Sequence, residues 1–166
     1  ENPLVKLGEN LRCAFANLHQ HTAESGREKE TAQFFGKDGA MCTVTSFSAD
    51  RFAQLRSACG LEEGKFWQSL CEEPLEVGDA QTGGKSGSQF WMTSDKLFVV
   101  KTSHWDELRT LQEILESYTQ YVATHRSSLL CRYFGAFSLR VDRKTHLTVV
   151  MNNVLAGPFE PHVVYD

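Results

Sequence analysis

The sequence lacks the features that mark several common classes of protein. Its five cysteines are scattered, odd in number and never spaced as C-x-x-C, so neither a disulfide framework nor a zinc site is predicted. No apolar run approaches the ~18 residues that a transmembrane helix requires. The first ten residues lack the basic and then apolar layout of a signal peptide. We therefore expect reduced thiols and a cytoplasmic protein.

The chain also lacks the basic excess of nucleic-acid-binding proteins, because its formal net charge is −4. No nucleic acid partner is expected, whereas contact with a membrane surface needs only one local basic face. The 166 residues, 41% of them hydrophobic, suffice for one domain or for one lobe of a larger protein. Asp166 follows Val-Val-Tyr with no polar tail, so we expect a fragment of a longer polypeptide.

Periodicity and turn residues predict alternating hairpins and helices. Alternating apolar residues predict hairpins at residues 33–47, 88–101 and 129–151, the last interrupted by Gly135. Helical spacing predicts helices over 10–19, 52–58 and 66–70, and one of about five turns up to residue 122. Ser103 and Asp106 are expected to form a capping box at the start of this long helix. The order predicts an α+β protein with an antiparallel β-sheet and helices packed on one face.

The polar run at residues 21–32 is expected to be a loop. It divides the chain into an N-terminal helix and linker, residues 1–32, and a main unit, residues 33–166. His19 and His21 have the spacing of two metal ligands, but no third ligand is evident nearby. They are interpreted as solvated histidines.

The turn GGKSGS, residues 83–88, precedes a strand that ends at Lys101. Its Gly84-Lys85-Ser86 triplet resembles part of a P-loop. A P-loop requires a glycine five residues before Gly84, where Asp79 stands, and a helix where an alternating strand follows. The sequence therefore excludes a P-loop.

A glycine-rich turn in a hairpin, a lysine on the next strand and a carboxylate on the following helix are typical of protein kinases. Lys101 alternates with the apolar Phe98 and Val100, so it is expected to point away from the face that they bury. Glu107 lies one to two turns into the predicted helix. The alternative from these residues alone is a surface hairpin whose last lysine reaches solvent.

Four motifs occur in order over about half of the chain: GGKSGSQFWMTSDKLFVVKT, LLCRYFGAFSLRV, HLTVVMNNVL and VVYD. Together they resemble the phosphatidylinositol phosphate kinases, in which the last motif would continue into D-L-K-G. Upstream, MCTVTSFSADRFAQLRSACGLEEGKFWQSL is similar to the type III members, the phosphatidylinositol 3-phosphate 5-kinases. The Met151-Asn152-Asn153 hinge is closer to the type I members, which act on phosphatidylinositol 4-phosphate. We favour type III on the longer segment.

The resemblance implies an ATP site. Lys101 would bind the phosphates and Glu107 would orient it, with Glu113 as the runner-up, and Lys85 would contact either phosphate or solvent. The other implied contacts are Gly84, Ser86, Gly87 and Ser88 over the triphosphate, Phe90 and Val99 against adenine, and Met151, Asn153 and Leu155 along the hinge. No metal ligand is expected in this chain. In the family, the acceptor-activating aspartate lies in an MDYSLL-like motif and the metal-holding aspartate in an I-I-D-like motif, and neither motif occurs here.

The implied function is that of the ATP-binding N-terminal lobe of a phosphatidylinositol phosphate kinase. The whole enzyme would use ATP and Mg²⁺ to phosphorylate the inositol ring of a phosphoinositide at a cytoplasmic membrane surface. Type III membership implies phosphatidylinositol 3-phosphate as substrate and an endosomal membrane. The alternatives are a type I-like phosphatidylinositol 4-phosphate 5-kinase lobe and a non-catalytic pseudo-kinase interaction module. Without the two aspartate motifs, this chain alone is expected to be inactive.

Overall fold

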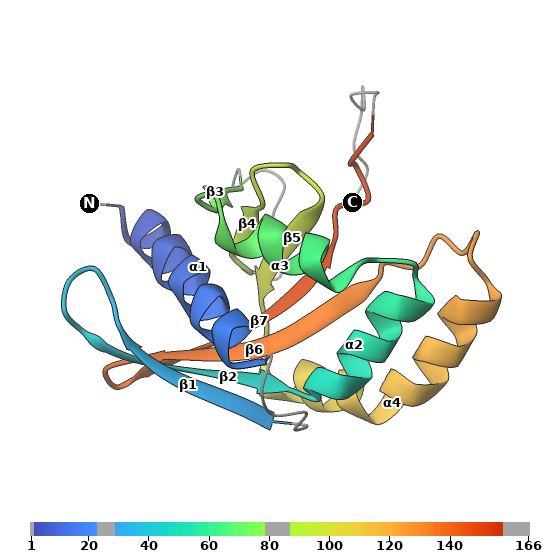
Figure 1. Ribbon diagram of the computed structural model, residues 1–166, viewed down its shortest axis with the longest axis horizontal. Helices are drawn as coiled ribbons and strands as arrows, with labels where there is room; N and C mark the ends of the chain where they lie inside the picture. Colours follow the sequence, from blue (N-terminus) through green and yellow to red (C-terminus); the bar gives the residue numbers. More distant parts are fainter. Residues whose placement is uncertain (1, 23–28, 79–86, 158–166) are drawn as a thin grey trace.

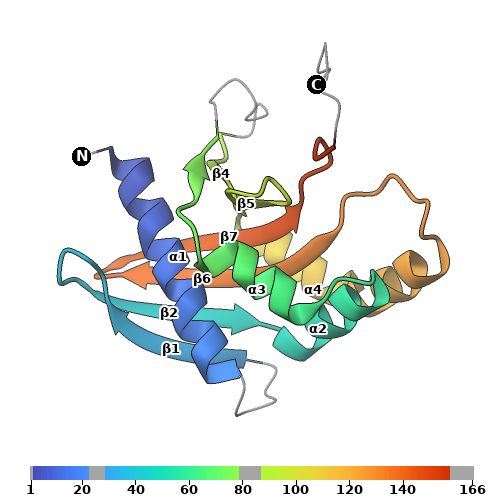
Figure 2. The ribbon, with the colours of Figure 1, turned by 45° about the horizontal axis from the view of Figure 1, so that its top comes forward.

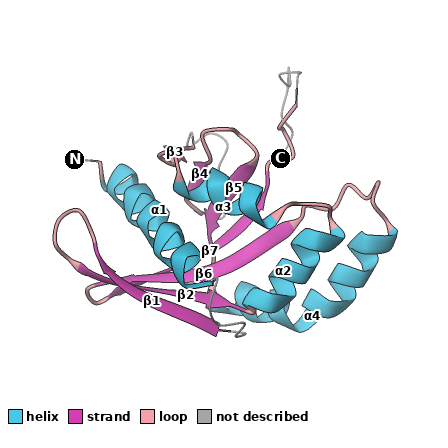
Figure 3. Cartoon of the chain, in the orientation of Figure 1, coloured by secondary structure: helices cyan, strands magenta, loops and turns pink. Residues whose placement is uncertain are grey.

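The computed structural model describes residues 2–22, 29–78 and 87–157, which form four helices and seven strands. The helices are α1 (Pro3–Thr22), α2 (Ala49–Ala58), α3 (Glu63–Cys71) and α4 (Trp105–Thr124). The strands are β1 (Lys29–Phe35), β2 (Met41–Phe47), β3 (Glu76–Val77), β4 (Phe90–Met92), β5 (Phe98–Thr102), β6 (Tyr133–Val141) and β7 (Lys144–Asn152). Figure 1 and Figure 3 show their arrangement.

All seven described strands belong to one sheet, in the order β1-β2-β6-β7-β5-β4-β3. Every neighbouring pair is antiparallel. The three predicted hairpins are the β1–β2, β4–β5 and β6–β7 pairs, and α4 carries the chain from β5 to β6 (Figure 2). The α+β class and the antiparallel sheet are confirmed. The short strand β3 adds an edge that the predicted hairpins did not include.

Backbone conformation explains where the hairpins turn. Gly39 closes the β1–β2 hairpin with a φ of 79°, in the left-handed region that glycine adopts without steric cost. Asp142 has a φ of 51° in the β6–β7 turn, and Asp is among the few other residue types that tolerate this region. In β6 the register with β7 shifts between Tyr133 and Gly135, which forms a bulge where the sequence predicted an interruption.

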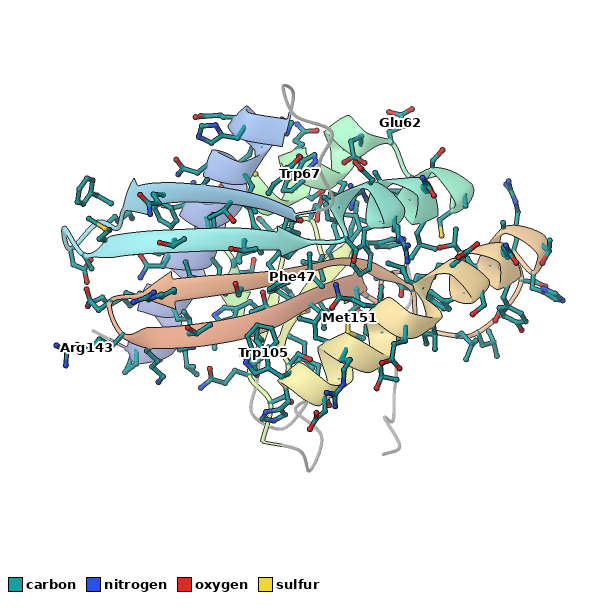
Figure 4. The ribbon with its side chains drawn as sticks, turned by 90° about the horizontal axis from the view of Figure 1, so that it is seen from below. Phe47, Glu62, Trp67, Trp105, Arg143 and Met151 are labelled. Atoms are coloured by element: carbon teal, nitrogen blue, oxygen red, sulfur yellow. The ribbon has the colours of Figure 1, made fainter. Side chains whose placement is uncertain are left out.

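The helices cover both faces of the sheet, whereas we expected them on one. α1 and α3 pack on the face that bears Val150, and α2 and α4 pack on the face that bears Val149. These two residues are adjacent on β7, so they point to opposite faces, and both are buried. Each face of the central strands therefore needs its own helical cover. Figure 4 shows α4 against β6 and β7 from below.

The first helix is twice as long as predicted and belongs to the same core as the sheet. It begins at Pro3, a residue that suits the first turn of a helix. It buries one apolar stripe in the cluster that includes the strands, formed by Leu7, Leu11, Ala14, Phe15 and Leu18. The segment that was predicted as a separate helix and linker thus shares its hydrophobic cluster with the main unit. None of the described helices has the length and apolar content needed to cross a bilayer.

The five cysteines are free thiols, as predicted: Cys13, Cys42, Cys59, Cys71 and Cys131. Burial raises the pKa of the Cys71 thiol to about 12, so this side chain is uncharged at neutral pH. Cys42 is fully buried and belongs to the core beneath α1. Cys59 and Cys71 pack against the core as well, whereas Cys13 and Cys131 belong to neither hydrophobic cluster. The interpretation as core filler therefore holds for Cys42, Cys59 and Cys71.

A buried arginine joins α2, α3 and the β6 bulge. Arg56 is only 4% exposed, and its Nε and Nη2 donate to the two carboxylate oxygens of Glu63 at 2.7 and 2.5 Å. Its Nη1 donates to the carbonyl oxygen of Phe134 at 2.6 Å. Phe134 is the residue that the β6–β7 register skips, so its carbonyl needs a donor from outside the sheet. The guanidinium also lies 4.3 Å from the ring centroid of Phe66.

We predict that Arg56→Met lowers the free energy of unfolding by about 2–4 kcal/mol, because it leaves a buried carbonyl and a carboxylate without their donor. Urea denaturation followed by tryptophan fluorescence measures the loss. The matched control is Arg109→Met, whose partner Asp106 is 88% exposed and which is itself 71% exposed. This control is expected to change the free energy by less than about 0.5 kcal/mol. Equal losses in the two variants would contradict the structural role of Arg56.

Candidate active site

Strand β5 places Lys101 on the sheet face that α4 borders. Phe98 and Val100 are buried on the opposite face, under α1 and α3, and successive residues of a strand alternate between faces. Lys101 therefore emerges half-buried beside α4, between Phe90 of β4 and Val149 of β7. The orientation predicted from the sequence is confirmed.

A groove of about 460 Å³ lies between Lys101 and α4. One group of its lining residues is polar, Lys101, Ser103, Asp106, Glu107 and Thr110, and the other is apolar, Leu111, Ile114, Tyr133 and Val149. The structure thus brings Lys101 and Glu107 together at one hollow. The runner-up, Glu113, does not line it. An apolar hollow with a few convergent polar groups is the usual form of a small-molecule site.

Two hydrogen bonds hold the Glu107 carboxylate in place. Ser103 Oγ donates to Glu107 Oε2 at 2.8 Å, and the backbone N–H of His104 donates to the same oxygen at 3.3 Å. The Ser103 hydrogen bond is the largest cause that lowers the pKa of this carboxyl, and the His104 N–H and the positive charge of Lys101 add to it. Glu107 is therefore ionised and oriented before any ligand binds.

Glu107 and His104 form the capping pair of α4, which corrects the prediction of Ser103 and Asp106. The helix begins at Trp105, so the position three residues into the helix is that of Glu107. Asp106 instead accepts a hydrogen bond from Arg109 Nη2 at 2.7 Å. A shift of one residue changes which carboxylate turns back toward the strand end, and hence which one lies beside Lys101.

Lys101 has no carboxylate within 4 Å among the residues that the structure describes, so no ion pair neutralises it there. Glu107 lines the same groove, and the positive charge of Lys101 helps to lower the pKa of its carboxyl. The two groups do not form an ion pair. A half-buried cation near an ionised carboxylate, with space beside it, can bind an anionic group such as a phosphate.

An apolar surface extends from Lys101 across four strands. Met92, Val99, Met151 and Tyr133 pair in register from β4 through β5 and β7 to β6, and all four are half-exposed. Phe90 lies beside Lys101 on the same face and is also half-exposed. α4 packs over Val149 in the next row and reaches this row at Tyr133, whose ring centroid lies 6.5 Å from that of Tyr118. The predicted adenine contacts Phe90, Val99 and Met151 lie on one half-exposed apolar patch.

The segment after β7 is held by the side chain of Asn153. Its Nδ2 donates to the Lys96 carbonyl at 2.8 Å, its Oδ1 accepts from the Leu155 N–H at 3.0 Å, and its own N–H donates to the Leu97 carbonyl at 2.9 Å. Asn153 thus fixes the segment to the β4–β5 turn and has no free backbone N–H. Leu155, 49% exposed, is predicted to line the hinge but has its N–H engaged as well.

Val154 follows Asn153 in this segment and is 65% exposed. Neither its N–H nor its carbonyl has a partner in the described part of the chain. A free donor and acceptor together with an apolar surface can bind a heteroaromatic ring along its edge and its face. Sequence analysis missed Val154, because no residue pattern shows which backbone groups a neighbouring turn will occupy.

Part of the predicted phosphate-binding turn lies outside the described residues, namely Gly84, Lys85 and Ser86. Gly87 has a φ of 69°, a conformation that favours glycine, and it is exposed. Ser88 is half-buried and follows it toward β4. Ser103 and Tyr133, which line the groove, were not predicted as site residues. Within the described ranges, no group of three His, Cys, Asp or Glu side chains is placed to hold a metal ion.

The chain has the arrangement of a kinase N-terminal lobe. Its antiparallel sheet carries Lys101, α4 places the Glu107 carboxylate at the same groove, and the segment with Asn153 leaves the neighbouring strand β7. The family model described as Phosphatidylinositol-4-phosphate 5-Kinase matches residues 71–166, more than half of the chain. The chain belongs to this family.

Three curated relatives illustrate the similarity. The chain is 29% identical over 155 residues to "Phosphatidylinositol 4-phosphate 5-kinase 7" of Arabidopsis thaliana, covering 87% of the chain and 20% of that protein. It is 32% identical over 115 residues to the type-1 alpha enzyme of Rattus norvegicus, covering 69% and 21%. It is 31% identical over 115 residues to the type-1 sktl enzyme of Drosophila melanogaster, covering 69% and 14%. The chain thus spans about a fifth or less of the length of these relatives.

We predict that the carboxyl carbon of Glu107 titrates by NMR below the ordinary pKa of glutamate and moves upward in Ser103→Ala, since the serine hydroxyl is the largest stabiliser of the ionised form. A lowered folded-state pKa means that the carboxylate stabilises the fold above its ordinary pKa, and that this contribution is lost as the pH falls through the lowered value. Thr110→Val, in the same groove but without a bond to Glu107, serves as the control. An unchanged midpoint in Ser103→Ala would rule out the capping interaction as the cause.

Proposed function

We propose that this chain is the ATP-binding N-terminal lobe of a phosphatidylinositol phosphate kinase. The whole enzyme transfers the γ-phosphate of ATP to a hydroxyl of an inositol ring. Family membership supports the reaction class, and the half-exposed apolar patch beside Lys101 supports the nucleotide. The observation that carries the proposal is Lys101 itself, half-buried, free of an ion pair among the described residues and facing the groove that Glu107 lines.

The described residues fit ATP in three ways. Lys101 supplies a cation for the phosphates, and the ionised Glu107 lines the same groove. The patch that includes Val99 and Met151 offers an apolar surface to adenine. Val154 offers to its edge an N–H and a carbonyl that no residue in the described ranges occupies. Phosphoryl transfer also uses Mg²⁺, which neutralises charge on the transferred group, and no described residue is assigned to hold it.

For the substrate, we propose phosphatidylinositol 4-phosphate, the lipid of the type I-like alternative. The relatives reported above are phosphatidylinositol 4-phosphate 5-kinases, two of them type-1 enzymes. They favour this alternative over the type III interpretation, which rested on the segment upstream of residue 71. Because such a lipid resides in a bilayer, the whole enzyme is expected to act at a membrane surface.

We predict that Lys101→Met in the full-length protein lowers turnover of the lipid kinase reaction by about 10²- to 10³-fold, the usual loss when one preorganised electrostatic donor is removed. Radiolabelled phosphate transfer to lipid vesicles measures it. Lys144→Met, an exposed lysine at the far end of β7, is the control and should leave turnover unchanged. Near-normal turnover in Lys101→Met would contradict the proposal that this lysine binds the phosphates of ATP.

We further predict that the full-length protein phosphorylates vesicles containing phosphatidylinositol 4-phosphate faster than vesicles containing phosphatidylinositol 3-phosphate. Chromatography of the product lipids distinguishes the two bisphosphates. Vesicles of phosphatidylcholine alone control for transfer to other acceptors. A clear preference for phosphatidylinositol 3-phosphate would restore the type III interpretation.

A further inference from the structure

One stripe of α1 contacts both chain segments that flank residues 79–86. Leu4, Gly8 and Arg12 follow one another at four-residue spacing, so they lie on one side of the helix. The incoming segment runs from the end of α3 through β3, and the outgoing segment leads into β4. Figure 1 shows α1 beside β3 and β4, on the opposite side of the sheet from α4.

The outgoing segment is held through Trp91 of β4, which is fully buried. Its indole Nε1 donates to the carbonyl oxygen of Leu4 at 3.0 Å. A Cβ atom at Gly8 would lie 2.9 Å from both Nε1 and Cδ1 of this ring, closer than such atoms approach. Only glycine at this position lets the helix rest directly on the indole.

The incoming segment is held by the same stripe. Arg12 Nη1 donates to the carbonyl oxygen of Cys71 at 3.0 Å, at the end of α3. The Gly8 position also lies against the chain at Leu75, whose carbonyl oxygen would be 3.6 Å from an added Cβ. The two segments then pair with each other, since Val77 of β3 is in register with Trp91.

The contact with α1 extends through the strand to the site. Trp91 and Phe90 are adjacent on β4 and point to opposite faces, so the ring against α1 and the ring beside Lys101 share one short piece of backbone. Phe90 also fixes the incoming segment, because its carbonyl accepts the N–H of Gly78 at 2.8 Å. A displacement of the indole therefore displaces Phe90 relative to Lys101.

We propose that the Leu4–Gly8–Arg12 stripe of α1 is a positioning element for nucleotide binding, acting through Trp91 on Phe90. It rests on the proposed function, since it concerns the affinity of the same site for ATP. The stripe residues do not touch the site, and α4 and Lys101 are on the other face of the sheet. The element thus sets the position of β4 without taking part in phosphate transfer.

The test is steady-state kinetics of the full-length protein carrying Gly8→Ala. In an exposed helix this change is favourable, but here the added methyl group pushes the helix off Trp91. We expect KM for ATP to rise about threefold to tenfold. This is the loss of ATP affinity that corresponds to one hydrogen bond or close contact. The KM for lipid and the turnover at saturating ATP should stay within about twofold of the unmodified protein.

A double variant tests the contact itself. Trp91→Phe removes the N–H donor to Leu4 and vacates the space that the Gly8 methyl group would enter. Trp91→Phe alone should raise KM for ATP, and Gly8→Ala combined with Trp91→Phe should raise it by less than the product of the single effects. Strict multiplication of the two effects would show that the residues act independently, and would overturn the proposal.

Phe15→Leu is the matched control, because Phe15 is a fully buried residue of α1 whose ring packs on Phe137 of β6. It should lower thermal stability without changing KM for ATP. If Phe15→Leu raised KM for ATP as much as Gly8→Ala does, the effect of the stripe would be one of general stability, and the proposal would be overturned. An unchanged KM in Gly8→Ala, in a protein that turns over ATP, would overturn it as well. A protein that does not use ATP at all would instead overturn the proposed function, and the stripe proposal with it.

Discussion

The burial of Phe98 and Val100 beneath α1 and α3 is the constraint on which the site depends. Because side chains alternate along a strand, this burial forces Lys101 to the other face, where α4 leaves a groove. A slip of one residue in the pairing of β5 with β7 would turn Lys101 into the core and expose Val100. The cost of burying an unpaired charge makes that register unfavourable. Hydrophobic packing on one face thus determines the chemistry on the other.

The electrostatics of the site follow from the start of α4. Glu107 is ionised and fixed by Ser103 and the His104 N–H, so its position depends on the helix cap rather than on a contact with Lys101. The lysine is therefore not neutralised by a close ion pair among the described residues. A preorganised carboxylate near an unpaired cation stabilises the cation while leaving its hydrogen-bond donors for an anionic ligand.

Much of this arrangement was predictable, because it depends on local patterns. The hairpins, the orientation of Lys101 and the interruption at Gly135 follow from alternation and turn residues, and α4 follows from its apolar stripe. Other features were not. The division of helices between the two faces depends on which residues of the central strands are buried on each side, and both sides of β7 are apolar, so its sequence does not identify either cover. The observed capping pair, His104 and Glu107, lies one residue after the predicted pair, because helix ends depend on local geometry that periodicity does not resolve.

The sequence by itself determined the order of the three hairpins and four helices, the class of fold and the motifs that mark the family, because each depends on residues close together in the chain. The tertiary structure decided which carboxylate lies beside Lys101 and that the side chain of Asn153 is bonded to the β4–β5 turn. It also decided that the backbone groups of Val154 have no partner among the described residues. It also brought α1 against β4, from residues separated by more than eighty positions. Hydrogen-bond partners and close contacts of this kind arise only when distant segments meet, so no local pattern encodes them.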